Sequence, residues 1–193
     1  MKKLSIFNLG NNVSSGVYFR LKDNREKAVI TFLINNIDEV ELDLVHPVKL
    51  ADGREVNVKC VAELDNDLKV IKDTCPLCGE GFKLSEKVAV NVYNHTTKSV
   101  QIWQLGKTLI EKLIFLAEKR PDLINHTYEV TRLGAKNDTN TSYEFEYLGA
   151  SDKKVFEGLE LIKKKETVYY EVSNEDLENF LITGDEKIFE RNK

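Results

Sequence analysis

The stretch EVELDLVHPVKLADGREVNVKC, residues 39–60, alternates apolar with polar side chains on either side of a turn at residues 51–53. On the first predicted strand, one face carries Val40, Leu42, Leu44 and His46. On the second, one face carries Val56, Val58 and Cys60. Because successive side chains of a strand point to opposite faces, this pattern predicts a hairpin with one dry face and one wet face.

The same alternation recurs along the chain. It predicts strands over residues 87–93 and 99–103, around a polar turn at 94–98, and over 127–132 and 142–147, around a loop at 134–138. One helix is predicted over 106–119, where Pro121 stops it, and a weaker one runs from a cap at Ser173 or Asn174 to Gly184. Many short strands with one helix between the late strands predict a mainly β protein. A five-stranded oligonucleotide-binding (OB) barrel fits that count, although periodicity alone does not separate it from other small barrels.

Charge is unevenly placed along the 193 residues. The net charge is −4, but residues 166–193 hold eight acidic and three basic side chains, a local net of −5 that leaves +1 for the rest. A near-neutral body can still carry a basic groove, so the composition does not exclude nucleic acid. No apolar stretch reaches the length of a secretion signal or a membrane span, which leads us to expect a cytoplasmic protein with reduced thiols.

Three cysteines and one histidine form a candidate metal site. Cys75 and Cys78 are two residues apart and are followed by glycine, a spacing that presents two thiolates to one metal ion. If the turn at 51–53 closes the first hairpin, His46 lies opposite Val58, one diagonal step from Cys60, on the same face. This geometry favours His46 over the other two histidines. The predicted ligands of a structural zinc ion are therefore His46, Cys60, Cys75 and Cys78.

Interpretations of these four residues without a metal ion remain open. The cysteine pair is also the spacing of a redox motif, and Cys60 fits an ordinary small buried side chain. His46 fits a hydrogen-bonded core histidine. A catalytic zinc is disfavoured, because four protein ligands leave no open position for water.

Aromatic and basic side chains supply candidate contacts to a single strand, which such proteins bind by base stacking within a basic groove. From the strand parity we place Tyr93 and Trp103 on the wetter faces of neighbouring strands, and Phe19 lies among basic residues near the start. The candidate phosphate contacts are Arg20, Lys22, Lys107, Arg132 and Lys136. The alternatives are that Trp103 packs against the C-terminal segment and that the basic side chains are merely solvated. Tyr143, Phe145 and Tyr147 are assigned mainly to the core.

An ordered set of motifs between residues 19 and 147 resembles the zinc-containing single-stranded DNA-binding proteins of bacteriophages and prophages. The set comprises Phe19-Arg20-Leu21-Lys22-Asp23, residues 32–46, Cys75-Pro76-Leu77-Cys78, Val100-Gln101-Ile102-Trp103 with Gly106-Lys107, Arg132-Leu133-Gly134-Ala135-Lys136 and Thr141-Ser142-Tyr143-Glu144-Phe145. The order of one histidine and three cysteines is also similar to that of the helix-destabilising proteins of T-even phages.

The resemblance implies an OB barrel over residues 1–150, with a zinc subdomain at about 46–82 inserted between early strands, and a partly helical acidic C-terminal extension over 151–193. It implies a protein that is not an enzyme and that coats single-stranded DNA during phage DNA replication, recombination and repair in the cytoplasm of the bacterial host. The acidic C-terminal region, residues 166–190, would recruit replication or recombination proteins.

Two other functions compete with this expectation. One is a zinc-stabilised adaptor of a phage or prophage that binds another protein and no nucleic acid, which the net charge of −4 favours. The other is a metal-dependent nuclease, which is disfavoured because no cluster of Asp and Glu has metal-ligand spacing and no nucleophile has a partner base.

Overall fold

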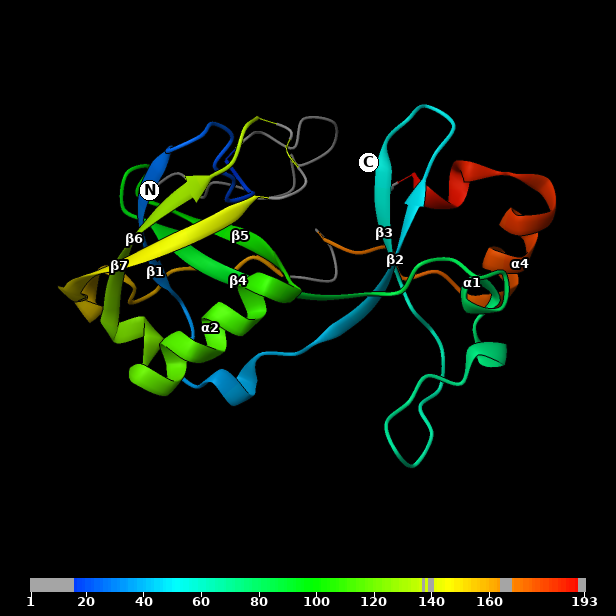
Figure 1. The fold of residues 1–193 in the computed structure, drawn as a ribbon, viewed down its shortest axis with the longest axis horizontal. Coiled ribbons are helices and arrows are strands. Elements are labelled where there is room, and N and C mark those ends of the chain that lie inside the picture. Colours follow the sequence, from blue (N-terminus) through cyan, green and yellow to red (C-terminus); the bar gives the residue numbers. More distant parts are fainter. Residues whose placement is uncertain (1–15, 137, 139–140, 164–167, 191–193) are drawn as a thin grey trace. The chain divides into compact units, whose positions relative to one another are not determined.

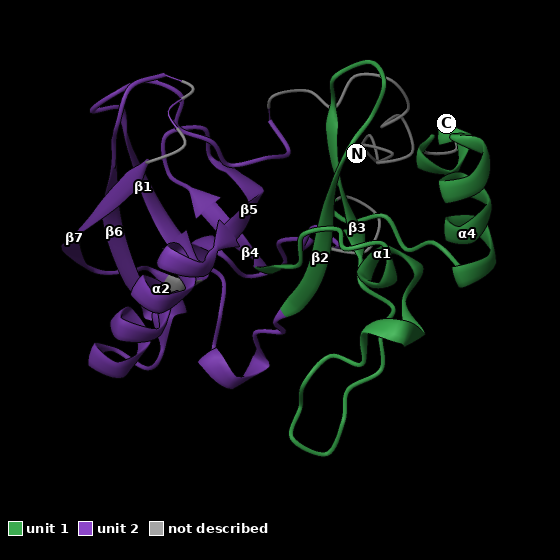
Figure 2. Ribbon diagram, turned by 45° about the vertical axis from the view of Figure 1, so that its right-hand side comes forward, with its two compact units in different colours: residues 1–15, 43–86, 168–193 green, residues 16–42, 87–167 purple. Residues whose placement is uncertain are grey.

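The computed structural model describes residues 16–136, 138, 141–163 and 168–190 (Figure 1). The chain forms two compact units, coloured separately in Figure 2. The described part of unit 1 comprises residues 43–86 and 168–190, and unit 2 comprises residues 16–42 and 87–167. The sequence grouped residues 151–193 as one extension, whereas the structure assigns residues as far as 167 to unit 2 and those from 168 onward to unit 1.

Seven antiparallel strands make the protein mainly β, as the sequence predicted. The pairing order is β3-β2-β4-β1-β6-β7, with β5 also paired to β4, and β4 begins in unit 1 and continues into unit 2. The strands are β1 (Lys27–Phe32), β2 (Asp43–Lys49), β3 (Glu55–Lys59), β4 (Ser85–Asn94), β5 (Ser99–Gly106), β6 (His126–Leu133) and β7 (Ser142–Ala150). Among the described residues, no helix is long and apolar enough to cross a bilayer.

Unit 2 holds five of these strands and the helix α2 (Lys107–Lys119). The helix confirms the prediction for residues 106–119: Gly106 is its N-cap, and it ends before Pro121. Its apolar stripe buries Leu113 and Ala117 against the sheet. Short 3₁₀ turns cover Ile37–Glu39, Leu123–Asn125 and Lys153–Val155. The core of unit 2 is built from buried apolar side chains, namely Phe19, Leu21, Ala28, Ile30, Phe32, Ile34, Val88, Val90, Val92, Trp103, Leu105, Leu113, Ala117, Leu123, Tyr128 and Val130.

The register of the β4–β5 hairpin corrects one prediction about its faces. Val90 lies opposite Trp103 and Val88 lies opposite Leu105, so Trp103 shares the apolar face of the β4 valines. The strand parity predicts both Trp103 and Tyr93 on the wetter faces of their strands, but Tyr93 lies opposite Val100, on the other face of the hairpin from Trp103. The hairpin pairs even-numbered residues of β4 with odd-numbered residues of β5. Side chains directly opposite each other in a hairpin point to the same face, so Trp103 faces the same side as the buried valines of β4 and not the wetter side expected for it.

Unit 1 is built on the hairpin of β2 and β3. His46 pairs with Val58, as predicted, and the turn closes with a hydrogen bond of 2.9 Å from Gly53 N to Leu50 O. Gly53 has a φ of 84°, a left-handed conformation that favours glycine. Strand β2 begins at Asp43 and not at residue 39, because residues 37–39 form a 3₁₀ turn. The short helix α1 (Pro76–Gly79) follows a 3₁₀ turn at Lys72–Thr74.

The C-terminal residues complete unit 1. Helix α4 (Asn174–Thr183) begins at the N-cap Ser173 and ends at Gly184, which confirms the weaker helix prediction, and a 3₁₀ turn covers Glu186–Phe189. Lys59 N donates to Tyr170 O and Tyr170 N donates to Asn57 O, both at 2.9 Å, so the segment pairs with the edge of β3. Leu177 and Phe189 are buried in the core of the unit.

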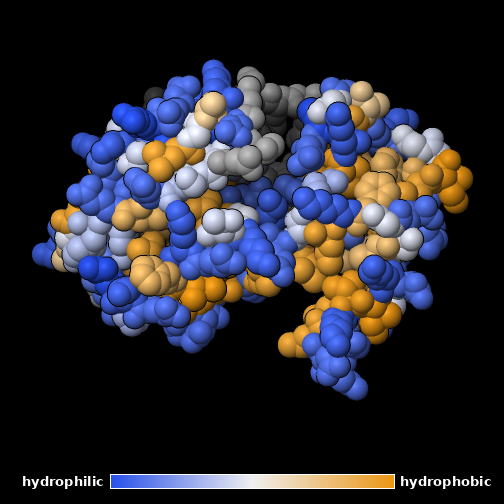
Figure 3. All heavy atoms as spheres, viewed as in Figure 1, coloured by the Kyte–Doolittle hydropathy of each residue, from blue (hydrophilic) through white to orange (hydrophobic). Residues whose placement is uncertain are grey.

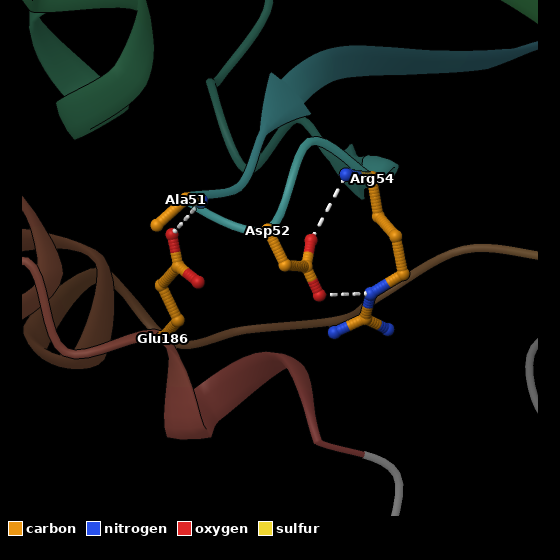
Figure 4. A network of polar contacts seen from close by, with 4 residues as sticks. All are labelled: Ala51, Asp52, Arg54 and Glu186. Atoms are coloured by element: carbon orange, nitrogen blue, oxygen red, sulfur yellow. Dashed lines mark hydrogen bonds and ion pairs between the residues drawn. The ribbon is translucent and has the colours of Figure 1, made fainter.

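A polar network links this segment to the turn of the hairpin (Figure 4). Ala51 N donates to a carboxylate oxygen of Glu186 at 2.6 Å, while Asp52 accepts from the backbone and side chain of Arg54 within the turn. Much of the acidic C-terminal region is therefore a folded part of unit 1.

Candidate metal centre

Four side chains from separate elements of unit 1 converge on one point. His46 lies on β2, Cys60 follows the last residue of β3, Cys75 is the N-cap of α1, and Cys78 lies within that helix. The ligand atoms of all four lie within 4.8 Å of one another, and no other group of metal-binding side chains occurs in the described ranges. The predicted set of His46, Cys60, Cys75 and Cys78 is thus brought together as a whole.

The distances within this cluster fit a tetrahedral ion. His46 Nε2 lies 3.6 Å from Cys75 Sγ and 3.5 Å from Cys78 Sγ, and the sulfurs of Cys60 and Cys78 are 3.6 Å apart. Bonds of about 2.3 Å from a tetrahedral zinc ion to two thiolates place the sulfurs roughly 3.8 Å apart. The site could therefore bind a metal ion with little rearrangement, and its donors are compatible with structural zinc.

The imidazole of His46 is oriented by the backbone. Its Nδ1 lies 3.1 Å from the carbonyl oxygen of Lys83, so Nδ1–H donates to this carbonyl and Nε2 is left facing the thiols. Burial lowers the pKa of His46 below its ordinary value, although the backbone groups of Lys83 and Phe82 oppose this shift. The neutral ring, which is the form that binds a metal, is favoured.

The three thiols cannot all ionise without a cation between them. Burial raises the pKa of Cys60, and it raises the pKa of Cys78 to about 12 together with the neighbouring sulfurs. Burial also opposes ionisation of Cys75, but hydrogen bonds from the backbone N–H groups of Cys78, Val61 and Leu77 bring its pKa below the ordinary value. A bound dication would stabilise all three thiolates, so metal binding would release protons.

The backbone around the cysteine pair forms a tight knuckle. Gly79 N donates to Cys75 O at 3.0 Å, Gly81 N to Cys78 O at 3.1 Å, and Phe82 N to Leu77 O at 2.9 Å. Gly81 has a φ of 76°, which a side chain at this position would disfavour. The site has four protein donors and no open position, which suits a structural and not a catalytic ion.

The aromatic residues predicted to stack on bases are buried. Trp103 is 4% exposed and packs between Phe19, at 4.7 Å, and Tyr143, at 5.4 Å between ring centroids. Phe19 itself is buried, and Tyr93 is only 8% exposed. The expectation that Trp103 and Tyr93 lie on an exposed face is therefore wrong. The alternative for Trp103, packing against the C-terminal segment, is wrong too, because its neighbours belong to the core of unit 2.

The predicted phosphate contacts divide into two groups. Arg132 is buried, and its guanidinium donates to Ala135 O at 2.9 Å and to Thr141 Oγ1 at 3.1 Å, so it holds the loop after β6. Arg20, Lys22, Lys107 and Lys136 are exposed. The guanidinium of Arg20 lies 5.3 Å from the ring centroid of Tyr18. Only these four keep the accessibility that a phosphate contact requires.

Sequence reasoning missed two features. One is the backbone carbonyl of Lys83, which orients His46. It cannot be recognised in the sequence, because every residue has a backbone carbonyl. The other is an open groove of about 740 Å³ in unit 2, between α2 and the strands β6 and β7. Its lining combines the cations Arg25, Lys27 and Lys112 with aromatic side chains and with Glu144 and Glu146. These residues are far apart in the sequence, so no local sequence pattern predicts the groove.

Comparison with known proteins adds no relative. No protein-family model, no curated protein and no solved structure matches this chain, so its interpretation rests on the geometry above.

Proposed function

We propose that this protein binds single-stranded DNA with little sequence preference, and that unit 2 is an OB barrel that carries this activity. The observation that supports it best is the strand arrangement of unit 2. Strand β1 lies between the β4–β5 hairpin and the β6–β7 hairpin, and α2 connects the two hairpins. Five strands with one helix between the late strands are what an OB barrel requires. The metal-binding residues 46–78 fall between β1 and β4, where the family resemblance expects its zinc insertion.

Ring contacts across the core support curling of this sheet into a barrel. Trp103 lies on β5 and Phe145 on β7, the two end strands of the unit 2 order β5-β4-β1-β6-β7, yet their ring centroids are 6.0 Å apart. Tyr143, also on β7, lies 5.4 Å from Trp103. A flat sheet would keep the side chains of its two edge strands apart.

The exposed cations of unit 2 would contact phosphates. Arg20, Lys22, Lys107 and Lys136 are the proposed contacts, and affinity should therefore fall as salt is added. The ion held by His46 and the three cysteines would be zinc, with the structural role of fixing unit 1. The role in phage DNA replication, recombination and repair, and the recruitment of partners by the acidic C-terminal region, belong to the same proposal.

Binding of a fluorescent oligothymidine at several salt concentrations tests the proposal, with a duplex of equal length as competitor. We expect preference for the single strand and a shallower salt dependence for Lys107→Glu and Lys136→Glu, because each removes a phosphate contact. Lys69→Glu makes the same charge change in unit 1 and serves as the matched control. Equal or stronger binding of the duplex by the unmodified protein would contradict the proposal.

A protein-binding adaptor remains the second candidate, and one feature of unit 1 favours it. The loop between Cys60 and Cys75 carries exposed apolar side chains, Leu64, Leu68 and Ile71, and Leu68 is 78% exposed with a φ of 61°. Figure 3 shows hydrophobic atoms beside hydrophilic ones on this projecting loop. Failure of the metal-loaded protein to bind single-stranded DNA, together with specific cross-linking to a host or phage protein from position 68, would favour the adaptor.

A further inference from the structure

The face of β4 that points away from the core of unit 2 carries polar and aromatic side chains. Asn91 and Tyr93 lie on this face, since Val88, Val90 and Val92 occupy the other one. On the neighbouring strand β1, Thr31 lies opposite Tyr93 and its hydroxyl is 3.0 Å from His95 Nε2. An amide, a phenol ring, a hydroxyl and an imidazole are the groups with which proteins read and stack nucleobases.

This face is covered by a segment of the same unit, residues 156–162, which we name the strap. Ile162 N donates to Asn91 Oδ1 at 2.9 Å, and Asn91 Nδ2 donates to Ile162 O at 3.1 Å. The ring of Phe156 stands edge-on to Tyr93, with centroids 5.4 Å apart, and lies 6.2 Å from His95. The cover explains why Tyr93 is buried although it lies outside the core. In Figure 1 the strap belongs to the orange-brown chain that follows β7.

The strap has few anchors of its own. It contains no strand, and it follows a single 3₁₀ turn at Lys153–Val155. Leu159 and Leu161 are exposed, the latter at 51%, so these apolar side chains do not secure it to the sheet. A pair of amide hydrogen bonds at one end and ring contacts at the other hold it over this face. Such a segment can be displaced without disturbing the core.

We propose that the strap occupies the nucleobase-binding face of unit 2 in the free protein and that a single strand displaces it. The Ile162 backbone presents one N–H donor and one C=O acceptor to the Asn91 amide, and an unpaired base edge presents the same combination. A base would replace Phe156 against Tyr93. The strap, residues 156–162, holds two acidic and no basic side chains, but the contacts through which it covers this face are hydrogen bonds and ring contacts. This inference rests on the proposed function.

Strap variants test the competition directly in the full, metal-loaded chain. Phe156→Ala removes the ring that covers Tyr93, and Ile162→Pro removes the N–H that binds Asn91. Neither change alters the proposed base contacts. We expect the double variant to bind oligothymidine about tenfold more tightly, since hydrogen bonds and ring contacts no longer oppose binding. Leu161→Ala, an exposed strap position, is the matched control and should leave affinity unchanged.

The outcomes separate the two proposals. Binding by the unmodified protein with no gain in the double variant overturns the strap proposal and leaves single-strand binding standing. No binding by either protein overturns both, and binding by the double variant alone supports both. Hydrogen exchange gives a second readout: adding oligothymidine to the unmodified protein should speed exchange at Ile162, and slower exchange there would overturn displacement.

Discussion

The two units of this protein are held together in different ways. Unit 2 has five strands, one long helix and a core of large apolar side chains. Unit 1 has one hairpin, two short helical elements near the cysteines and the C-terminal helix, and its core cluster includes Cys75 and Cys78 beside Leu77, Leu177 and Phe189. A two-stranded hairpin alone is only marginally stable in water. We therefore expect unit 1 to depend on the returning C-terminal segment and on a metal ion bound by His46 and the three cysteines.

Charge separates the units as well. Residues 16–42 and 87–167 hold 17 basic and 16 acidic side chains, a net of +1. The remaining residues hold 11 basic and 16 acidic side chains, a net of −5. The two parts add up to the net charge of the chain, −4. Under the proposed function, unit 2 with its exposed cations would bind DNA, and the acidic unit 1 would support it or recruit partners.

Metal removal should have the largest effect, and only on unit 1. Structural zinc contributes about 10–16 kcal/mol to the folding of small zinc peptides, so chelation or Cys75→Ser should unfold unit 1. Segment-resolved hydrogen exchange should show loss of protection in residues 43–86 and 168–190 while residues 87–133 keep theirs. Zinc should restore the chelated protein but not the variant. Equal loss of protection in both units would mean that they fold as one.

Acid, like metal removal, should destabilise unit 1. Burial lowers the pKa of His46 below its ordinary value of 6.5, so the unfolded chain takes up its proton first as the pH falls. The stability due to neutral His46 is complete above pH 6.5 and is lost as the pH falls through the lowered, folded value. Protonation also competes with the metal at all four ligands.

A zinc-sensitive dye at stepped pH should therefore report release below pH 6.5. Burial also lowers the pKa values of His95 and His126 in unit 2, but neither belongs to a metal-binding cluster of the described residues, so unit 2 should respond less steeply. A centre that retains its metal far below this range would count against neutral His46 as a ligand.

Substitution of Trp103 should disturb unit 2 and spare unit 1. Trp103→Ala removes a side chain that contacts Phe19, Phe32 and two aromatic residues of β7, and should cost about 3–5 kcal/mol in the free energy of unfolding of unit 2. Denaturant unfolding of the metal-loaded protein measures the loss. Phe115→Ala, at an aromatic residue of α2 that is 56% exposed, is the control and should cost far less. If the Trp103→Ala protein keeps its stability but loses DNA binding, Trp103 stacks on bases and does not act mainly as a core residue.

The smallest effect concerns the helix cap that starts α4 in unit 1. Ser173 Oγ accepts from Asp176 N at 3.1 Å, so Ser173→Ala should destabilise the helix by about 1 kcal/mol. Faster hydrogen exchange across residues 174–183 would report this change, and Ser173→Thr, which keeps an acceptor, should exchange nearly as slowly as the unmodified protein. Unchanged exchange in Ser173→Ala would show that tertiary packing, and not the cap, holds α4.

Local patterns predicted the parts of this protein that depend on neighbouring residues. The turn at 51–53 determined the pairing of His46 with Val58, and the spacing of Cys75 and Cys78 defined half of the metal site. Helix α2 followed from its apolar stripe and Pro121, and α4 from Ser173 and Gly184. In each case the signal is short-range, because turns, caps and strand alternation act over a few residues.

The sequence by itself therefore determined the mainly β class, the two helices and the four candidate ligands. Only the tertiary structure decided which faces are buried. The four-residue turn after β4 pairs Trp103 with Val90 and so sends it into the core, and the strap buries Tyr93 from more than sixty positions away. Burial depends on which distant segments meet, and alternation along a strand specifies only that its two faces differ.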